Sequence, residues 1–207
     1  MKSSVWRAGI LLIGLAFGVG ACLSSDAPTL ATEDLTEPAA FAGAYYATDF
    51  PEEKSTTGAI DATMEAIGDR TFRLTFSEGE HKDAPILVRL LTLNDGTLLG
   101  VGTDPDPTKA AVYAVVTHAS NGSWVFRSLD FKSDGRDGKL RDALMRHGAK
   151  AVTFGTDDIE SNEIKGSLTA ANLRALFSDP DFTRALDTSR GFRLSPKNSA
   201  SSGIALQ

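Results

Sequence analysis

The chain has 207 residues, of which 21 are basic and 27 acidic, so its formal net charge at pH 7 is −6. An acidic chain is a poor candidate for binding nucleic acid or anionic lipid headgroups through a protein face. It contains one cysteine, so no internal disulfide can form. Its length is typical of one domain, which buries about 70 % of its unfolded surface and folds without a disulfide or a metal.

The first 22 residues have the three-part pattern of an export signal. Residues 1–7 contain Lys2 and Arg7 and no acidic residue, and residues 8–21 form an uncharged, mostly apolar run. This run has the length of a signal-peptide core and is shorter than the ~20 residues of a membrane-spanning helix. It ends on Val19-Gly20-Ala21-Cys22, in which an aliphatic and two small residues precede the cysteine.

This ending resembles the lipobox of bacterial lipoproteins, with Val in place of the commoner Leu and Gly in place of Ala or Ser. The resemblance covers only the first 22 residues. It implies cleavage after Ala21, a diacylglyceryl group on Cys22 and, usually, acylation of the new α-amine. Because Cys22 has no internal disulfide partner, lipidation also explains an odd thiol in an exported protein. The alternatives are a plain secretory signal cut after Ala21 and an uncleaved anchor.

The same resemblance implies a location in the cell envelope. The residue after the cysteine is Leu23 and not Asp, which is similar to enteric lipoproteins that are passed to the outer membrane. We therefore expect the protein at the periplasmic face of the outer membrane, held there by the covalent lipid on Cys22. Removal of residues 1–21 leaves 19 basic and 27 acidic residues and a net charge of −8, so we expect no nucleic acid partner.

Composition sets the boundaries of the folded domain. Residues 22–38 are rich in Ser, Thr, Asp, Glu, Ala and Pro and have no hydrophobic period. They predict a lipidated flexible tether with a reach of roughly 20 Å. Residues 195–207, rich in Ser, Ala, Gly and Asn, predict a disordered tail. Residues 39–194 remain as a single β-rich domain.

Alternation of apolar and polar residues predicts strands in the first half of this domain. It occurs at 60–66 and 72–77, and Gly68-Asp69 between them favours a two-residue type II′ turn. Two more pairs follow: 86–93 and 97–103 flank Asn94-Asp95-Gly96, and 111–118 and 123–131 flank Asn121-Gly122. The last pair favours a type I′ turn, in which both residues need a positive φ. Three successive hairpins predict an antiparallel meander.

The strand predicted at 86–93 is apolar on both faces. Val88 and Leu90 point one way and Leu91 and Leu93 the other, with Arg89 as the one charged residue. Such a strand must be covered on both sides, by a second sheet, by a helix, or by a barrel interior and a packed helix.

Helix signals follow in the second half of the chain. Asp137 is a candidate N-cap for a helix that stops at Gly148, Thr169 for a second helix, and Asp179-Pro180 for a last short one. Weaker strands are predicted at 149–155 and 163–168. The fold class is α+β: an antiparallel β-meander, either a sheet or barrel-like, of seven to nine strands, with short helices in the C-terminal half.

The domain opens on Gly43-Ala44-Tyr45, which resembles the Gly-x-Trp at the start of lipocalin barrels, with Tyr45 in place of Trp and without the other landmarks of that family. The resemblance implies, as an architectural analogy, an aromatic residue that closes one end of a barrel. The alternative is a first strand whose tyrosines pack in the core or at the rim. An analogy of fold does not establish function.

No linear motif identifies a catalytic, cofactor-binding or metal-binding residue. His81, His118 and His147 are far apart and lack metal-ligand spacing. The acidic loops at 104–106 and 134–137 lack the spacing of calcium loops and are typical of turns. Neither Gly-x-Ser-x-Gly nor a phosphate-binding glycine loop is present. We therefore expect no cofactor.

Two functions from different classes remain. The missing motifs favour a non-enzymatic envelope lipoprotein that binds a protein partner or an apolar ligand. The alternative is an envelope hydrolase or transferase whose site is assembled from scattered Asp, Glu, His and Tyr side chains. That alternative requires carboxylates such as Glu65, Asp130 and Asp142, or a carboxylate and His118, to converge in one pocket. A cavity inside the sheet would favour a small ligand, whereas a filled interior places the function on the surface.

Overall fold

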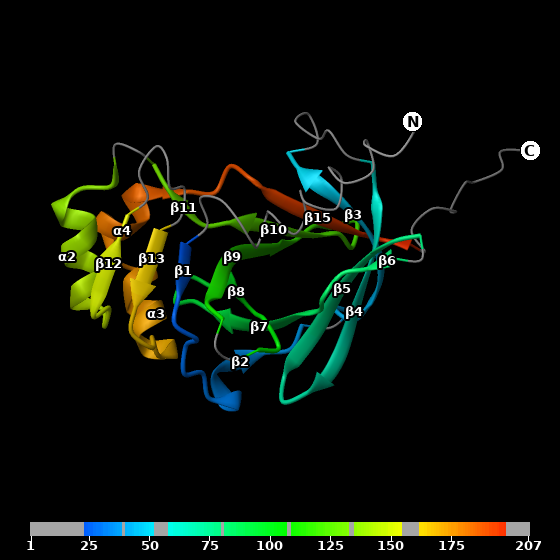
Figure 1. Ribbon diagram of the computed structural model, residues 1–207, viewed down its shortest axis with the longest axis horizontal. Helices are drawn as coiled ribbons and strands as arrows, with labels where there is room; N and C mark the ends of the chain where they lie inside the picture. Colours follow the sequence, from blue (N-terminus) through cyan, green and yellow to red (C-terminus); the bar gives the residue numbers. More distant parts are fainter. Residues whose placement is uncertain are drawn as a thin grey trace, which may run out of the picture.

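The computed structural model describes residues 23–38, 40–51, 58–79, 81–106, 109–132, 135–154 and 162–197 (Figure 1). Its centre is a closed antiparallel barrel, built within these residues from β3 (Gly43–Phe50), β4 (Ile60–Gly68), β5 (Thr71–Glu78), β7 (Ile86–Thr92), β8 (Leu98–Thr103), β9 (Ala111–His118), β10 (Trp124–Ser128) and β15 (Gly191–Pro196). The strands pair in that order, and β15 closes the ring between β10 and β3. The short β6 (His81–Lys82) pairs antiparallel with the end of β5. The predicted α+β class, with a barrel-like meander, is confirmed.

The barrel encloses the first of two hydrophobic cores. On β7, Val88 and Leu90 belong to this interior core, whereas Leu91 and, just after the strand, Leu93 belong to the second one. The prediction of a strand covered on both sides is therefore confirmed. The buried interior residues are Phe41, Tyr45, Ala47, Ala62, Met64, Phe72, Leu74, Phe76, Val88, Leu90, Ala114, Val116, Trp124, Phe126, Phe192 and Leu194.

Aromatic side chains occupy much of the barrel interior. The Phe126 and Phe192 rings stack with their centroids 4.6 Å apart, and Phe76 meets Phe192 edge to face at 5.7 Å. At the end of the barrel where β3 begins, Phe41 packs edge to face on Trp124 at 4.8 Å. Eight strands enclose a space wide enough for side chains to fill or for one small ligand, and here these rings pack within it.

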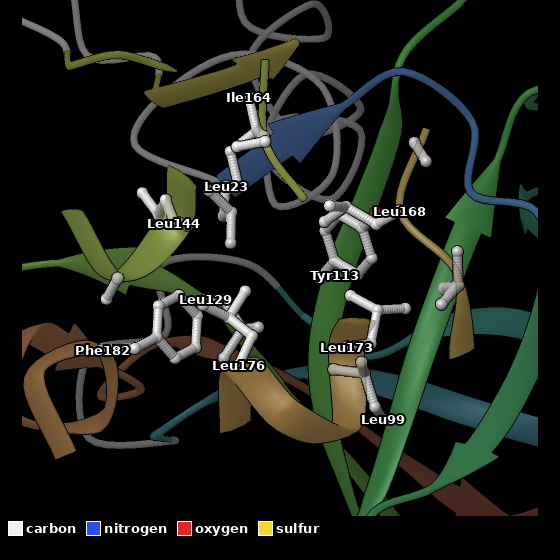
Figure 2. Packing of buried hydrophobic residues seen from close by; sticks show 14 of the residues in the cluster. Leu23, Leu99, Tyr113, Leu129, Leu144, Ile164, Leu168, Leu173, Leu176 and Phe182 are labelled. Atoms are coloured by element: carbon white, nitrogen blue, oxygen red, sulfur yellow. The ribbon is translucent and has the colours of Figure 1, made fainter. Parts of the chain in front are cut away.

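The chain leaves the barrel after β10 and forms a second layer before it returns as β15. The layer consists of β11 (Asp130–Phe131), α2 (Gly138–Arg146), β12 (Ala151–Thr153), β13 (Asn162–Lys165), α3 (Ala170–Phe177), α4 (Pro180–Ala185) and β14 (Leu186–Asp187). Figure 2 shows Leu173 of α3 beside Leu99 and Tyr113 on the outside of the barrel, and Leu176 of α3 beside Leu129. These residues belong to the second hydrophobic core.

The predicted helix starts are confirmed. The Asp137 carboxylate accepts the Leu140 amide proton at 3.0 Å, and Thr169 forms a capping box with Asn172. Asp179 accepts the amide proton of Asp181 at 2.9 Å, with Pro180 at the first helical position of α4. These caps satisfy amide groups that a helix leaves without an internal partner.

The segment predicted as a tether is instead part of the fold. It forms β1 (Leu23–Ser25), the 3-10 turn η1 (Thr32–Asp34) and β2 (Leu35–Thr36). β1 pairs with β9 and β13, and β2 pairs with β7. Leu23 is 2 % exposed and Leu35 4 % exposed. The prediction of a flexible tether over residues 22–38 is therefore wrong for residues 23–36, because two isolated leucines fill core positions and backbone pairing holds the residues between them.

Two turns differ from their predicted types. The β4–β5 turn is centred on Asp69-Arg70, with φ of 48° and 52°, and Gly68 is the last residue of β4, beside a bulge. The β9–β10 loop contains one residue of positive φ, Gly122. Its hydrogen bonds, from the Gly122 amide to the Ala119 carbonyl and from the Ala119 amide to the Ser123 carbonyl, close a three-residue loop instead of a type I′ turn.

The folded domain also ends later than the predicted boundary at residue 194. Ser195 and Pro196 belong to β15, where they pair with Tyr46 and Tyr45. The Lys197 ammonium lies 2.8 Å from the Asp61 carboxylate. The predicted tail is thus wrong for residues 195–197, because the strand that closes the barrel needs them as partners for β3. The remainder of the predicted tail, 198–207, lies outside the described residues.

Candidate functional site

The predicted cleavage and lipidation residues, Ala21 and Cys22, lie outside the described residues. Their neighbour Leu23 is described and is buried in the second core. Its amide donates a hydrogen bond to the Leu129 carbonyl at 2.7 Å. Its side chain points into the second core between Leu144 and Leu129 (Figure 2). Consecutive Cα atoms are 3.8 Å apart. A group attached to Cys22 is therefore joined to a rigid part of the domain by a single peptide bond.

A buried pair of hydroxyls holds β1 on the barrel. The Ser25 hydroxyl, on a side chain with no exposed surface, lies 2.6 Å from the Tyr113 hydroxyl and 2.6 Å from the Asp26 carbonyl oxygen. Because Ser25 donates to that carbonyl, Tyr113 must donate to Ser25. Burial raises the pKa of Tyr113 to about 12, and the bond to Ser25 partly offsets the effect. Tyr113 is therefore a protonated donor at neutral pH.

Next to the start of β1 lies a polar cluster around Asp130. One oxygen of its carboxylate accepts hydrogen bonds from the Phe131 amide and the Asn162 side chain, both at 2.7 Å. The Arg136 guanidinium lies 3.6 Å from the same oxygen. Burial raises the pKa of Asp130, the Phe131 amide and Arg136 lower it, and the charge of Asp187 raises it further. The cluster joins the strand that leaves the barrel to the sheet of the second layer.

A second polar cluster joins α2 to α4. The Asp179 carboxylate, 8 % exposed, is 2.8 Å from the Arg146 guanidinium and 2.9 Å from Nε2 of His147. The hydrogen bond from Arg146 lowers the pKa of Asp179 to about 2, with His147 and the Asp181 amide adding to the effect against burial. Among the residues that the structure describes, no hydroxyl is hydrogen-bonded to His147. The contact between Asp179 and His147 therefore links α2 to α4, and the described residues place no nucleophilic hydroxyl on it.

The carboxylates and the histidine considered from the sequence make separate contacts in the described structure. Glu65 forms an ion pair of 3.2 Å with Arg73 on the outside of the barrel, and Asp142 lies exposed on α2. The His118 ring stacks on Trp124 at 4.1 Å. Within the described part of the chain, no hydrogen bond or ion pair connects any two of Glu65, Asp130, Asp142 and His118.

Tyr45, the aromatic of the Gly-x-aromatic start, is packed in the interior core of the barrel. It is 3 % exposed, and its hydroxyl lies 2.9 Å from the carbonyl oxygens of Ala40 and Phe41. Burial raises the pKa of Tyr45, and the nearby indole N–H of Trp124 offsets this in part. That N–H is buried and does not reach hydrogen-bond geometry with any acceptor. These contacts place both side chains in the core.

Neither the acidic loops nor the helices supply a further site. The Asp104 carboxylate accepts the Asp106 amide proton at 2.8 Å and pairs with Lys109 at 3.1 Å, which confirms a turn. In the described ranges, no three His, Cys, Asp or Glu side chains are grouped so that they could hold a metal ion. None of the described helices is long and apolar enough to cross a membrane.

The sequence did not reveal a group of basic and aromatic side chains on the outer wall of β3, β10 and β15. Two guanidinium groups lie over the Phe50 ring, with Arg127 at 5.1 Å and Arg193 at 5.7 Å from its centroid. Arg190 precedes β15, and the Ser128 amide donates to its carbonyl at 2.9 Å. We call Phe50, Arg127, Arg190 and Arg193 the basic-aromatic face. Alternation in 124–128 and 191–196 places both strand arginines outward, but only barrel closure brings them to Phe50.

Comparisons with known proteins add no relative. No protein-family model matches the chain, and neither the curated proteins nor the solved structures contain a match.

Proposed function

We propose that the protein is a lipid-anchored lipoprotein of the cell envelope whose rigid barrel domain binds a partner protein and performs no catalysis. The observation that carries the binding part is the filled barrel. Phe76, Phe126 and Phe192 pack on one another at centroid distances of 4.6 and 5.7 Å in its interior. Because side chains occupy the interior of the barrel, a partner protein would bind its outer surface or its loops.

The anchor is supported by the lipobox at residues 19–22, which follows a basic start and an apolar run of signal-peptide length. On this proposal the chain is cut after Ala21, and Cys22 carries the lipid. The protein then lies at the periplasmic face of the outer membrane, since Leu23 follows the lipidated cysteine.

The two other hypotheses have less support. An apolar ligand would need space that the aromatic rings of the barrel occupy. A hydrolase or transferase would need convergent titratable groups. The carboxylates of Asp130 and Asp179 are instead hydrogen-bonded, the first to Asn162 and the second to Arg146 and His147.

The anchor is tested by comparing wild type with Cys22→Ser in the native host. We expect wild type in the membrane fraction, with an acylated N-terminal peptide by mass spectrometry. The Cys22→Ser protein should be folded, with an unchanged melting temperature, and should leave the membrane in a high-salt wash. Retention of that variant in the salt-washed membranes would contradict the anchor.

The binding part needs a separate experiment. A photo-crosslinking amino acid at exposed positions around the barrel should give a discrete adduct with one envelope protein in living cells. Ala44 on β3 and Thr63 on β4 are exposed and suit this purpose. If no position around the barrel gave an adduct, the proposal of a protein partner would be overturned, whatever the outcome for the anchor.

A further inference from the structure

We propose that the folded domain hides its own processing site, so that the bond between Ala21 and Cys22 has to be cut before β1 docks. This inference rests on the proposed cleavage in front of a lipidated Cys22. The cut is a hydrolysis: water adds to the Ala21 carbonyl carbon and the C–N bond breaks. Ala21 leaves as a carboxylate, and Cys22 keeps the nitrogen as a free α-amine. A precursor that completed its fold first would keep its signal.

The bond to be cut lies next to the second core. Ala21 precedes Leu23 by two residues, which span at most about 7 Å of extended chain. Leu23 is 2 % exposed, and its amide is bonded to the Leu129 carbonyl at 2.7 Å. A peptidase has to hold its substrate in extended form on both sides of the bond that it cuts, and Leu23 is part of that stretch. In the folded domain this residue is out of reach.

Both backbone edges of β1 are also occupied. One edge pairs with β9, where Ser24 faces Val112, and the other pairs with β13, where Leu23 faces Asn162. An extended peptide is bound through its backbone N–H and C=O groups, in the way that a strand is added to a sheet edge. Since both edges are taken, β1 has to leave the sheet before a peptidase can bind it.

Further contacts hold β1 in place. The Ser25 hydroxyl is bonded to the Tyr113 hydroxyl at 2.6 Å. Directly after the strand, the Asp26 amide donates to the Ile164 carbonyl at 3.3 Å, and the Asp26 carboxylate accepts the Gly166 amide proton at 2.8 Å. Opening of β1 breaks these contacts together, which makes the open form rare. A protease acts on such a segment only in the fraction of molecules in which it is open.

The barrel itself does not need β1. Its strands pair with one another in a closed ring, and β1 is not among them. In the second layer, by contrast, β1 lies between β9 and β13 (Figure 1), so the β12–β13 hairpin joins the barrel sheet through β1. β1 can therefore dock on a barrel that is already closed, and its docking completes the second layer.

The test uses the full precursor, purified in detergent and reconstituted into membranes of the native host, which supply the processing enzymes. The decisive variant has an insert of about six residues between Cys22 and Leu23. The insert starts with Leu-Ser, so that the residues next to the cut are unchanged. It adds roughly 20 Å of chain between the cut and β1. Each protein is added either folded or freshly diluted from urea, and mass spectrometry follows the shortened product over time.

We expect the folded wild type to be cut at least about 30-fold more slowly than the folded insert variant, and the two to be cut equally fast from urea. Thirtyfold corresponds to about 2 kcal/mol, the lower end of the cost of deleting a buried leucine side chain.

A substitution far from the cut in sequence gives a second measurement. Tyr113→Phe removes the bond to Ser25 and should speed cleavage of the folded precursor by about fivefold, because β1 opens more often. The matched control is Tyr45→Phe, which removes a hydroxyl bonded to the Phe41 carbonyl inside the barrel. It should leave the cleavage rate unchanged. Circular dichroism of each precursor before the assay verifies the folded starting state.

Equal cleavage rates for the folded wild type and the folded insert variant would overturn the inference and leave the cleavage site intact. Resistance of the folded insert variant would also overturn it, since the protection would then come from a part of the protein other than β1. If the membranes cut none of the proteins, the wild type from urea included, the proposed signal would be refuted first, and the order of events with it.

Discussion

The hydroxyl groups of Ser25 and Tyr113 lie 2.6 Å apart in the buried seam between β1 and the barrel. Ser25 follows the proposed lipidation site by only three residues, whereas Tyr113 lies on the outer face of β9, in the second core. A hydrogen bond between them, with both side chains shielded from water, makes residues 23–25 an integral part of the domain. The core therefore fixes how closely the proposed lipidation site is joined to the fold.

Removing the acceptor of this pair should cost more than removing the donor. Ser25→Ala leaves the Tyr113 hydroxyl buried without its partner and should lower the free energy of unfolding by about 1–3 kcal/mol. Tyr113→Phe leaves Ser25 still bonded to the Asp26 carbonyl and should cost about 1 kcal/mol. In urea unfolding the double variant should cost less than the sum, because the two groups share one interaction. Strict additivity would mean that the pair is not formed.

Truncation of Leu23 tests directly whether the start of the mature chain is core or tether. Leu23→Ala should lower the free energy of unfolding by roughly 2–5 kcal/mol, the usual cost of deleting a buried leucine side chain. Leu30→Ala, in the same segment but only partly buried, should cost less. Denaturant unfolding of the protein with Cys22→Ser as background measures both. A tether would make both substitutions silent.

Gly191 allows the barrel to close. A Cβ at this position would lie 2.8 Å from the Phe126 carbonyl carbon and 2.9 Å from the Arg127 Cα, both of them backbone atoms. Since backbone cannot move aside as a side chain end can, Gly191→Ala should cost about 3 kcal/mol or more, or prevent folding. The control Gly138→Ala, in a helix where a Cβ meets nothing within 4 Å, should change stability by less than about 1 kcal/mol. Similar melting temperatures for the two variants would contradict this role.

The Asp179 cluster should make stability depend on pH at the acidic end. Its pKa is about 2 in the folded protein and about 3.9 in an unfolded chain. A folded pKa below the unfolded one means that the contribution is complete above pH ~4 and is lost as the pH falls toward 2. Asp179→Asn keeps the N-cap and removes the charge, so it should cost about 1–2 kcal/mol at neutral pH, the half-exposed Arg146 limiting the effect.

The same variant should differ from wild type progressively less as the pH approaches 2. Melting curves at a series of pH values measure this convergence. Asp181→Asn is the matched control, because its carboxylate lies 3.7 Å from the same Arg146 and is more exposed. A gap between Asp179→Asn and wild type that stayed constant down to pH 2 would show that the ion pair is not its cause.

Much of the fold could be predicted from local pattern. Alternation in 72–77 predicted β5, and the two apolar faces of 86–93 predicted that the barrel wall is packed on both sides. Asp137 and Thr169 were sufficient to place two helix starts. Each of these signals depends on residues only a few positions apart in the sequence. They hold in the folded state because the apolar residues that recur with the period of a strand or helix are the ones that face the core.

The candidate site could not be predicted in this way. The basic-aromatic face joins Phe50, Arg127 and Arg193, which come from three distant parts of the chain. β15, which supplies Arg193, has a short alternating pattern next to a polar C-terminal segment, so composition assigned its last residues to a tail. Its role as the closing strand depends on pairing with both β10 and β3.

By itself the sequence determined the local strands and helices and the single thiol, because these depend on residues close together along the chain. The export signal and the lipobox resemblance depend on the first 22 residues alone and stay a prediction. Only the tertiary structure decided that the barrel closes and fills, and that residues 23–25 join it. β1 pairs with residues 162–164, far along the chain. That pairing uses backbone hydrogen bonds and one buried leucine, which leave no periodic pattern in the sequence.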